Sequence, residues 1–225
     1  MGYHIDTGLI YEKFNVDCEC PLCEIRKIVE EQFLYEFLND AVMEENTRAK
    51  VNSLGFCSRH FEMLFKRPNK LSVALQTDTR VDEILKRLTP VSSVTAGKKQ
   101  AKTIEKLSST CIVCDLIEES MKKYYKTIAQ MFVKENDFSK LLISSKGFCL
   151  EHYASLLKYS SHASFMARFY VKTLYDLQKR NLLRVQKNLQ DFCVSHDYRN
   201  AGKPLGDAET ALERMGIKLY GDKNS

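Results

Sequence analysis

Two short cysteine motifs occur twice in this chain, in the same order and at nearly the same spacing. In each copy a C-x2-C motif precedes a C-x2-H motif that directly follows a Gly-Phe pair. The residues are Cys20, Cys23, Cys57 and His60 in the first copy, and Cys111, Cys114, Cys149 and His152 in the second. The C-x2-C motifs are offset by 91 residues and the C-x2-H motifs by 92. This self-similarity predicts two copies of one structural unit of about 90 residues.

The repeat and the local composition suggest boundaries along the 225 residues. The segment TPVSSVTAGKKQAK is rich in Pro, Ser, Thr, Gly and Lys and has no apolar period, so we expect it to link the copies. The expected parts are a lead-in over 1–16, a metal-binding repeat over 17–88, a linker over 89–103, a second repeat over 104–192 and a C-terminal extension over 193–225.

Apolar residues recur at steps of three and four, which is typical of amphipathic helices. The stripes are Ile25, Val29, Phe33 and Phe37; Leu71, Ala74, Val81, Leu85 and Leu88; Ile117, Met121, Tyr124, Ile128 and Met131; and Phe165, Phe169, Leu174 and Leu177, extending toward Phe192. Strand-like alternation between Asn-Gly or Asp-Gly turns is absent. We therefore predict an all-α protein with two tandem three-helix repeats, each holding one Cys3His site, and a short helix over Ala208–Met215 that Gly216 ends.

Three thiolates and one imidazole form a ligand set of tetrahedral structural zinc. Residues three apart in a first helical turn face the same way, so each motif can hold one ion with two side chains. We expect one Zn2+ in each copy, bound by the four ligands of that copy, with the 33 or 34 residues between the motifs forming a long helix and a short return. The positive ends of the helices would stabilise the anionic site.

Other interpretations of the cysteines stay open. They could be buried and inert, or they could bind an iron–sulfur cluster or act in thiol redox chemistry, although the common cluster spacings differ. A thioredoxin-like motif would need a βαβ setting. Cys18 and the Cys193–His196 pair lie outside the repeat, and we favour plain buried cysteines over a third site. His4 and His162 have no partner in the sequence pattern.

Several classes of function are disfavoured. Walker, G-x-G-x-x-G and G-x-S-x-G motifs are absent, so we predict no catalytic residues and lean against an enzyme. The pairs Glu30-Glu31, Glu44-Glu45 and Glu118-Glu119 are expected on solvent faces. We give the same interpretation to Lys98, Lys99 and Lys102, and to Lys179, Arg180, Arg184 and Lys187. Two zinc sites would lower the formal charge of +5 to about +3, which disfavours nucleic acid as a partner.

The sequence shows neither a secretory signal nor a run of about 20 apolar residues that could span a membrane, so we expect a cytoplasmic protein. In a reducing compartment its cysteines would be thiols or metal ligands. The 11 Tyr and 12 Phe could fill a core or line a cavity that binds a small ligand.

The stretches DCECPLCEIRKIVEE, MEENTR, GFCSRHFEMLFK, FCVSHDYRN and AETALERM resemble an uncharacterised bacterial family, found mostly in anaerobic Gram-positive species. The resemblance covers nearly the whole chain and implies a helical fold marked by the eight paired Cys and His residues. Some members are labelled transporter substrate-binding proteins, a role that we do not expect for a chain without an export signal. We expect a cytoplasmic zinc-binding interaction or regulatory module with a protein or small-molecule partner.

Overall fold

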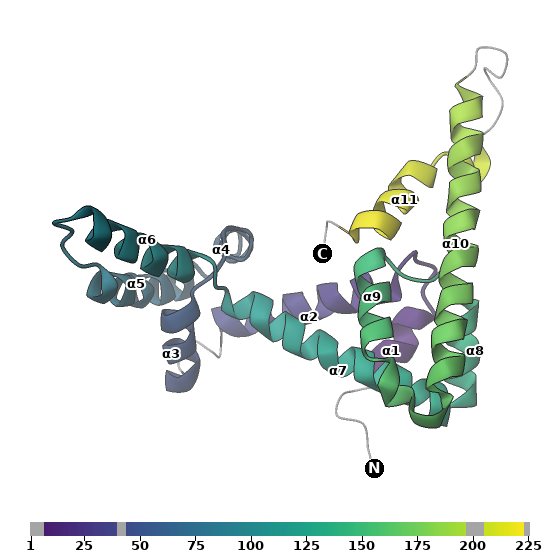
Figure 1. Ribbon diagram of the computed structural model, residues 1–225, viewed down its shortest axis with the longest axis horizontal. Helices are drawn as coiled ribbons and strands as arrows, with labels where there is room; N and C mark the ends of the chain where they lie inside the picture. The colour runs from purple at the N-terminus through teal and green to yellow at the C-terminus, as the bar shows by residue number, and fades with distance from the viewer. Residues whose placement is uncertain (1–6, 40–43, 197–204, 223–225) are drawn as a thin grey trace. The chain divides into compact units, whose positions relative to one another are not determined.

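The structure is a computed structural model that describes residues 7–39, 44–196 and 205–222 (Figure 1). Within these residues there are eleven α-helices and two 3-10 helices, and no β-strand, so the all-α prediction is confirmed. The elements are α1 (Thr7–Phe14), α2 (Pro21–Leu38), α3 (Glu45–Leu54), α4 (Ser58–Phe65), α5 (Lys70–Arg87), α6 (Val94–Ser108), α7 (Ile112–Lys134), α8 (Asn136–Ser144), α9 (Leu150–Lys158), η1 (Ser160–Met166), α10 (Ala167–Ser195), η3 (Gly206–Ala208) and α11 (Ala211–Tyr220).

The chain divides into two compact units whose boundaries fall inside helices. Unit 1 comprises Met1–Ile28 and Ser120–Ser225, and unit 2 comprises Val29–Glu119. Helix α2 therefore begins in unit 1 and ends in unit 2, whereas α7 begins in unit 2 and ends in unit 1. Each unit combines segments from both copies of the repeated motifs.

Unit 1 is built around the 29-residue helix α10, which packs against α8, α9 and α11 (Figure 1). Its core contains edge-to-face aromatic contacts, with the ring centroid of Phe138 lying 5.2 Å from that of Phe14. Tyr170 of α10 is fully buried, and its ring lies 5.0 Å from that of Phe132 on α7. Aromatic pairs of this kind add about 1 kcal/mol each to the burial of their area.

In unit 2, helix α5 packs against α3 and α4 with a partly polar inner face. The Gln76 Nε2 donates to the Phe37 carbonyl oxygen at 2.7 Å, and the Ser72 Oγ donates to the Leu38 carbonyl oxygen at 2.8 Å. These bonds satisfy carbonyl groups at the end of α2 that lack partners within the helix. The polar side chains thus fix which face of α5 lies inside.

The apolar stripe predicted for this helix is consequently exposed, which corrects the sequence-based expectation of a core face. Leu71 is 69% exposed and Leu85 is 58% exposed, and the other members of the stripe, Ala74, Val81 and Leu88, are exposed as well. Asp78, which lies on the same face of the helix as these residues, is also exposed. The periodicity identified a helix correctly but not the face that packs.

Other expectations also need correction. Four helices rather than three lie in 17–88, because the short helix α3 was not predicted. Most of the expected linker 89–103 belongs to α6, whose first turn is capped by the Ser93 Oγ accepting from the Ala96 N–H at 3.1 Å. No residue of α6 is buried, so it has no core-facing apolar pattern that could reveal it. Helix α11 continues through Gly216 and ends before Gly221, which has a φ of 76°.

Three glycines allow a test of these local conformations. Gly55 and Gly147 have φ values of 67° and 79°, and a Cβ on Gly55 would lie 2.9 Å from the Arg80 Nε. We predict that Gly55→Ala and Gly147→Ala each lower the free energy of unfolding by about 1–2 kcal/mol, because a side chain disfavours the left-handed region.

Gly216 is the matched control, since it lies within α11 and a Cβ there would have no atom within 4 Å. Gly216→Ala should raise the free energy of unfolding by up to about 1 kcal/mol. Denaturant unfolding of the three variants measures both effects, and a stabilising Gly55→Ala or Gly147→Ala would contradict the backbone assignment.

Candidate metal centres

The eight repeated Cys and His residues come together as two groups of four. Site 1, in unit 1, consists of Cys20, Cys23, Cys149 and His152. Site 2, in unit 2, consists of Cys57, His60, Cys111 and Cys114. Within each site the four ligand atoms all lie within 4.8 Å of one another.

The grouping differs from the one predicted, because each site takes its C-x2-C motif from one copy and its C-x2-H motif from the other. The expected sets, Cys20, Cys23, Cys57 and His60, and Cys111, Cys114, Cys149 and His152, do not assemble. The helix lengths explain this outcome. The 18 residues of α2 extend for about 27 Å, whereas the 10 residues of α3 cover only about 15 Å and cannot return the chain to the starting point. In the second copy α7 has 23 residues and α8 has only 9, so α8 is likewise too short to return the chain to the start of α7.

Site 1 has the dimensions of a coordination shell around one ion. The Nδ1 of His152 lies 3.3, 3.5 and 3.2 Å from the Sγ atoms of Cys20, Cys23 and Cys149, and the Sγ atoms of Cys23 and Cys149 are 3.8 Å apart. Tetrahedral zinc, with Zn–S of about 2.3 Å and Zn–N of about 2.0 Å, places sulfurs about 3.8 Å apart and nitrogen about 3.5 Å from sulfur. The observed distances fit these values.

Site 2 has nearly the same geometry. The Nδ1 of His60 lies 3.3, 3.2 and 3.4 Å from the Sγ atoms of Cys57, Cys111 and Cys114. The Sγ atoms of Cys57 and Cys114 are 3.9 Å apart. Both sites therefore offer three sulfurs and one Nδ1 at the corners of a small tetrahedron.

Helix starts position the ligands in each site. Cys57 and Cys149 are the N-cap residues of α4 and α9, and each precedes the His of its motif by three residues. Helix α2 begins at Pro21, a residue type that suits the first turn of a helix, and places Cys20 and Cys23 at its start. The unpaired N–H groups and partial positive charge of these helix ends favour anionic ligands.

The thiols within each site differ in how readily they ionise, because one thiolate disfavours a second one beside it. In site 2, burial raises the pKa of Cys111, but hydrogen bonds with His60 and with backbone N–H groups outweigh burial and bring it to about 6. Burial and the adjacent Cys111 charge raise the pKa of Cys114 to about 12. In site 1, hydrogen bonds from the other two thiols hold the pKa of Cys149 well below its usual range, whereas burial raises that of Cys20. A bound cation would remove this conflict.

Site 2 has a buried carboxylate behind its histidine. The Nε2 of His60 lies 2.8 Å from an Oε1 of Glu30, whose side chain is 2% exposed. Arg59 donates two hydrogen bonds to the same carboxylate, at 2.7 and 2.8 Å. Burial raises the pKa of Glu30, but the bonds from His60 and Arg59 lower it overall, so the carboxylate is ionised. A carboxylate here orients the imidazole and directs Nδ1 toward a metal.

Glu30 was predicted on a solvent face together with Glu31, and this expectation is wrong for Glu30. Glu31 is exposed, as are Glu44, Glu45, Glu118 and Glu119. Glu30 lies next to a stripe residue on α2, and its partner His60 is 30 residues away, so the local pattern carries no signal of its role.

Site 1 lacks the corresponding carboxylate. Met121 stands 91 residues after Glu30, at the equivalent place in the second copy, and it is 2% exposed. The Nε2 of His152 is buried and has no hydrogen-bond partner within the described part of the chain. Both histidines therefore present Nδ1 to the sulfurs of their sites, but the Nε2 of His60 faces a carboxylate, whereas the buried Nε2 of His152 faces none among the described residues.

The C-terminal segment encloses site 1. A Cβ on Gly221 would lie 4.0 Å from the Sγ atoms of both Cys23 and Cys149, and all four ligands are buried. In site 2, by contrast, Cys114 is exposed and Cys57 is half-buried. From the sequence, this segment was expected only to form part of the C-terminal extension over 193–225, with no role at a site.

A buried ionic cluster lies beside site 1. Lys218 of α11 is fully buried, and its Nζ donates to the Glu19 carbonyl oxygen at 2.5 Å and lies 3.2 Å from the Glu19 carboxylate. Arg184 of α10 donates to both carboxylate oxygens of Glu19, at 2.8 and 2.6 Å. Burial lowers the pKa of Lys218, while Glu19 raises it. This cluster joins α10 and α11 to the residue that precedes Cys20.

The remaining cysteines and histidines join neither site. Cys193 is exposed, which corrects the expectation of a buried residue, and within the described residues neither it nor Cys18 belongs to a group of three or more such ligands. The Nδ1 of His196 lies 2.9 Å from the Phe192 carbonyl oxygen. His162 contacts the Tyr159 ring, and His4 lies outside the described residues.

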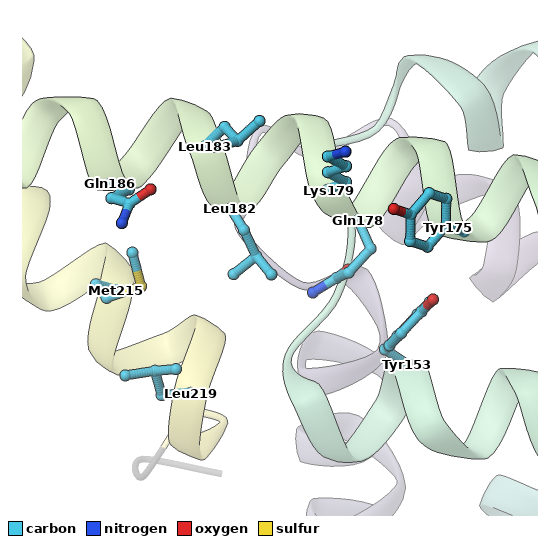
Figure 2. Close-up of a pocket in the computed structure, with 9 residues that line it drawn as sticks. All are labelled: Tyr153, Tyr175, Gln178, Lys179, Leu182, Leu183, Gln186, Met215 and Leu219. Carbon is cyan, nitrogen blue, oxygen red and sulfur yellow. The ribbon is translucent and has the colours of Figure 1, made fainter.

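An aromatic groove of about 540 Å3 lies between α9, α10 and α11 (Figure 2). Tyr153 and Tyr175 lie at one end of the groove, and Leu182, Met215 and Leu219 line the rest (Figure 2). Its only ionised lining residue is Lys179, whose Nζ lies 5.8 Å from the centroid of the Tyr175 ring. This groove contains no paired nucleophile and base.

The fold and the sites define a helical protein with two Cys3His groups that could each hold a metal ion. The sequence matches the Family of unknown function (DUF6062) over residues 1–225, and the chain belongs to that family. No curated protein and no solved structure shows significant similarity to the chain. None of the helices in the described residues combines the length and apolar character that crossing a membrane requires.

Double substitutions test the exchange of motifs between copies. Cys23→Ser with Cys149→Ser affects site 1 alone, so the protein should retain one zinc ion per chain, whereas Cys23→Ser with Cys57→Ser should lose both. If the motifs grouped within each copy, the first double variant would lose both ions and the second would retain one. Native mass spectrometry of the two double variants measures the number of bound ions, and the opposite pattern would overturn the sites described above.

The carboxylate behind His60 predicts a difference in affinity. Glu30→Gln should weaken zinc binding at site 2 by about 10- to 100-fold, because a neutral amide supports the imidazole less well. Competition with a chromophoric chelator should then show one weakened and one unchanged ion. Glu31→Gln is the control, because Glu31 is the exposed neighbour and pairs with Arg67 rather than with a ligand. Equal affinities for the two Glu variants would show that Glu30 does not support the site.

Proposed function

We propose that this chain is a cytoplasmic, non-enzymatic zinc-binding protein that acts as an interaction or regulatory module. Its eight ligands would be Cys20, Cys23, Cys149 and His152 at site 1 and Cys57, His60, Cys111 and Cys114 at site 2. The observation that carries the proposal is the convergence of these residues into two tetrahedra of the size that a single ion requires. The free thiols need a reducing compartment in order to remain ligands.

The chemistry of the donors favours zinc. Three soft thiolates with one imidazole suit Zn2+, and the resulting site carries a net charge of −1 that the helix starts can stabilise. All four corners of each tetrahedron are occupied by protein atoms, so no position remains for a water molecule or a substrate. Closed sites of this kind are structural, which supports a role in folding rather than in catalysis.

The zinc ions would hold together segments that are distant in sequence. Site 1 joins the start of α2 to the start of α9, and site 2 joins the start of α4 to the start of α7. In unit 2 the core is small, and the inner face of α5 is partly polar. Metal binding can supply folding free energy to such a unit, and we infer that removal of zinc unfolds unit 2 before unit 1.

An iron–sulfur or thiol redox protein remains the alternative. A cluster would bind its ligands through several different irons and so would spread them further apart than ligands that share one ion. The sulfur–sulfur distances of 3.8 and 3.9 Å support a single ion. The exposed sulfur of Cys114 is the feature that most favours thiol chemistry at site 2.

A small-ligand binder is the second alternative, and the groove of Figure 2 is the observation that favours it. Its volume of about 540 Å3 lies within the range of known ligand sites. An apolar molecule with a polar end would suit Tyr153 and Tyr175 at one end and the leucine and methionine side chains elsewhere.

Metal analysis of anaerobically purified protein tests the proposal. We expect two zinc ions per chain, no visible absorption band, and about one zinc ion in Cys57→Ser together with a lower stability. Cys193→Ser is the matched control, because Cys193 is an exposed cysteine outside both sites, and it should retain two ions. Protein without metal after expression in zinc-supplemented medium, or a brown protein that contains iron and sulfide, would overturn the proposal.

A further inference from the structure

A groove of about 390 Å3 in unit 2 is strongly cationic. Arg87, Lys99, Lys102 and Lys106 line it, together with hydroxyl-bearing side chains and two leucines, and no Asp or Glu is among the lining residues. All four cationic residues are exposed, and none of them forms a salt bridge with a carboxylate in the described part of the chain. Glu83 interacts electrostatically with Arg87, but four cationic side chains around one concave surface still create a positive potential.

The cations are arranged on two walls of the groove. Lys99, Lys102 and Lys106 share one face of α6, over a length of about 10 Å along the helix. Arg87 is the last residue of α5. The Gln100 side chain joins the two helices, because its Nε2 donates to the Arg87 carbonyl oxygen at 3.2 Å and its Oε1 accepts from the Thr89 Oγ1 at 2.8 Å. This link holds Arg87 near the lysine-bearing face.

Arg80 supports the end of the groove that Ser53 and Leu107 line. Arg80 donates to the carbonyl oxygens of Asn52 and Ser53, each at 2.7 Å, and to that of Leu107 at 2.9 Å. These bonds tie the end of α3 to the end of α6. Burial and the positive charge of Arg87 lower the pKa of Arg80, whereas Glu83 raises it.

We propose that this groove binds a small polyphosphate anion, such as a nucleoside triphosphate or inorganic triphosphate. Several closely spaced phosphate groups match several lysines and an arginine on opposite walls, whereas a single carboxylate would leave most of the charges unpaired. The groove is short and concave, which suits a small ligand better than the extended backbone of a nucleic acid. The proposal is independent of the zinc sites, whose ligands do not line the groove.

The structure also separates lysines that the sequence had grouped. Lys98, Lys99 and Lys102 were all predicted to form a solvated face, yet only Lys99 and Lys102 line the groove. Lys98 lies on the same helix, is equally exposed and carries the same charge, but it is not a lining residue. It is therefore a matched control for any effect of net charge.

Isothermal titration calorimetry with inorganic triphosphate and with ATP, in about 50 mM salt without magnesium, tests the proposal. We expect saturable binding by the full-length protein with its metal. Lys102→Gln, Lys106→Gln and Arg87→Gln should each raise the Kd by about five- to tenfold, and Lys98→Gln by less than about twofold. Circular dichroism should show unchanged folding, because all four side chains are exposed.

Polyphosphates also chelate zinc, so the zinc content is measured before and after each titration, and heat from metal extraction is subtracted. Absence of saturable triphosphate binding would overturn the proposal, as would an equal loss of affinity in Lys98→Gln and Lys102→Gln. A 20-nucleotide single strand that binds much more tightly than triphosphate, with the same sensitivity to the lining variants, would identify a nucleic-acid surface instead and would also overturn it.

Discussion

The crowding of three thiols and one imidazole into a space less than 5 Å across is the physical constraint that most distinguishes this fold. Burial and neighbouring sulfurs raise the pKa of Cys20 and Cys114 while Cys111 and Cys149 become easier to ionise, and a cation shared by one group would favour the ionised form of all its thiols. The ligands come from helix starts that are far apart in sequence. The packing of both units thus brings together two groups of residues that could each hold a metal ion.

The two sites share their ligand set but differ in the residues around it. At site 2, Glu30 and Arg59 form a charged chain behind His60, and one sulfur faces solvent. At site 1, Met121 stands at the place equivalent to Glu30, and Gly221, directly after α11, lies against Cys23 and Cys149. Burial of the ligands slows the access of water, chelators and oxidants, whereas an exposed thiol admits them. Ions bound at the two sites would therefore exchange with solvent at different rates.

The sequence identified the helical class and all eight members of the two groups, because spacing within a helical turn is a local property. It could not show which motifs meet, since that depends on how far α2 and α7 carry the chain. It placed the stripe of Leu71 and Leu85 inside, because periodicity finds an apolar face without showing what packs on it. Glu30 and Lys218 were missed for a related reason: their partners His60 and Glu19 are 30 and 199 residues away.

The exchange of motifs between the copies has a consequence for any shorter chain. A polypeptide with one C-x2-C and one C-x2-H motif, arranged as in either copy, would hold two half-sites and could complete neither alone. Two such polypeptides could complete both sites by pairing symmetrically, each giving its cysteine pair to the other. The present chain supplies both C-x2-C motifs and both C-x2-H motifs itself, so residues at equivalent places in the two copies, such as Glu30 and Met121, can differ between the sites.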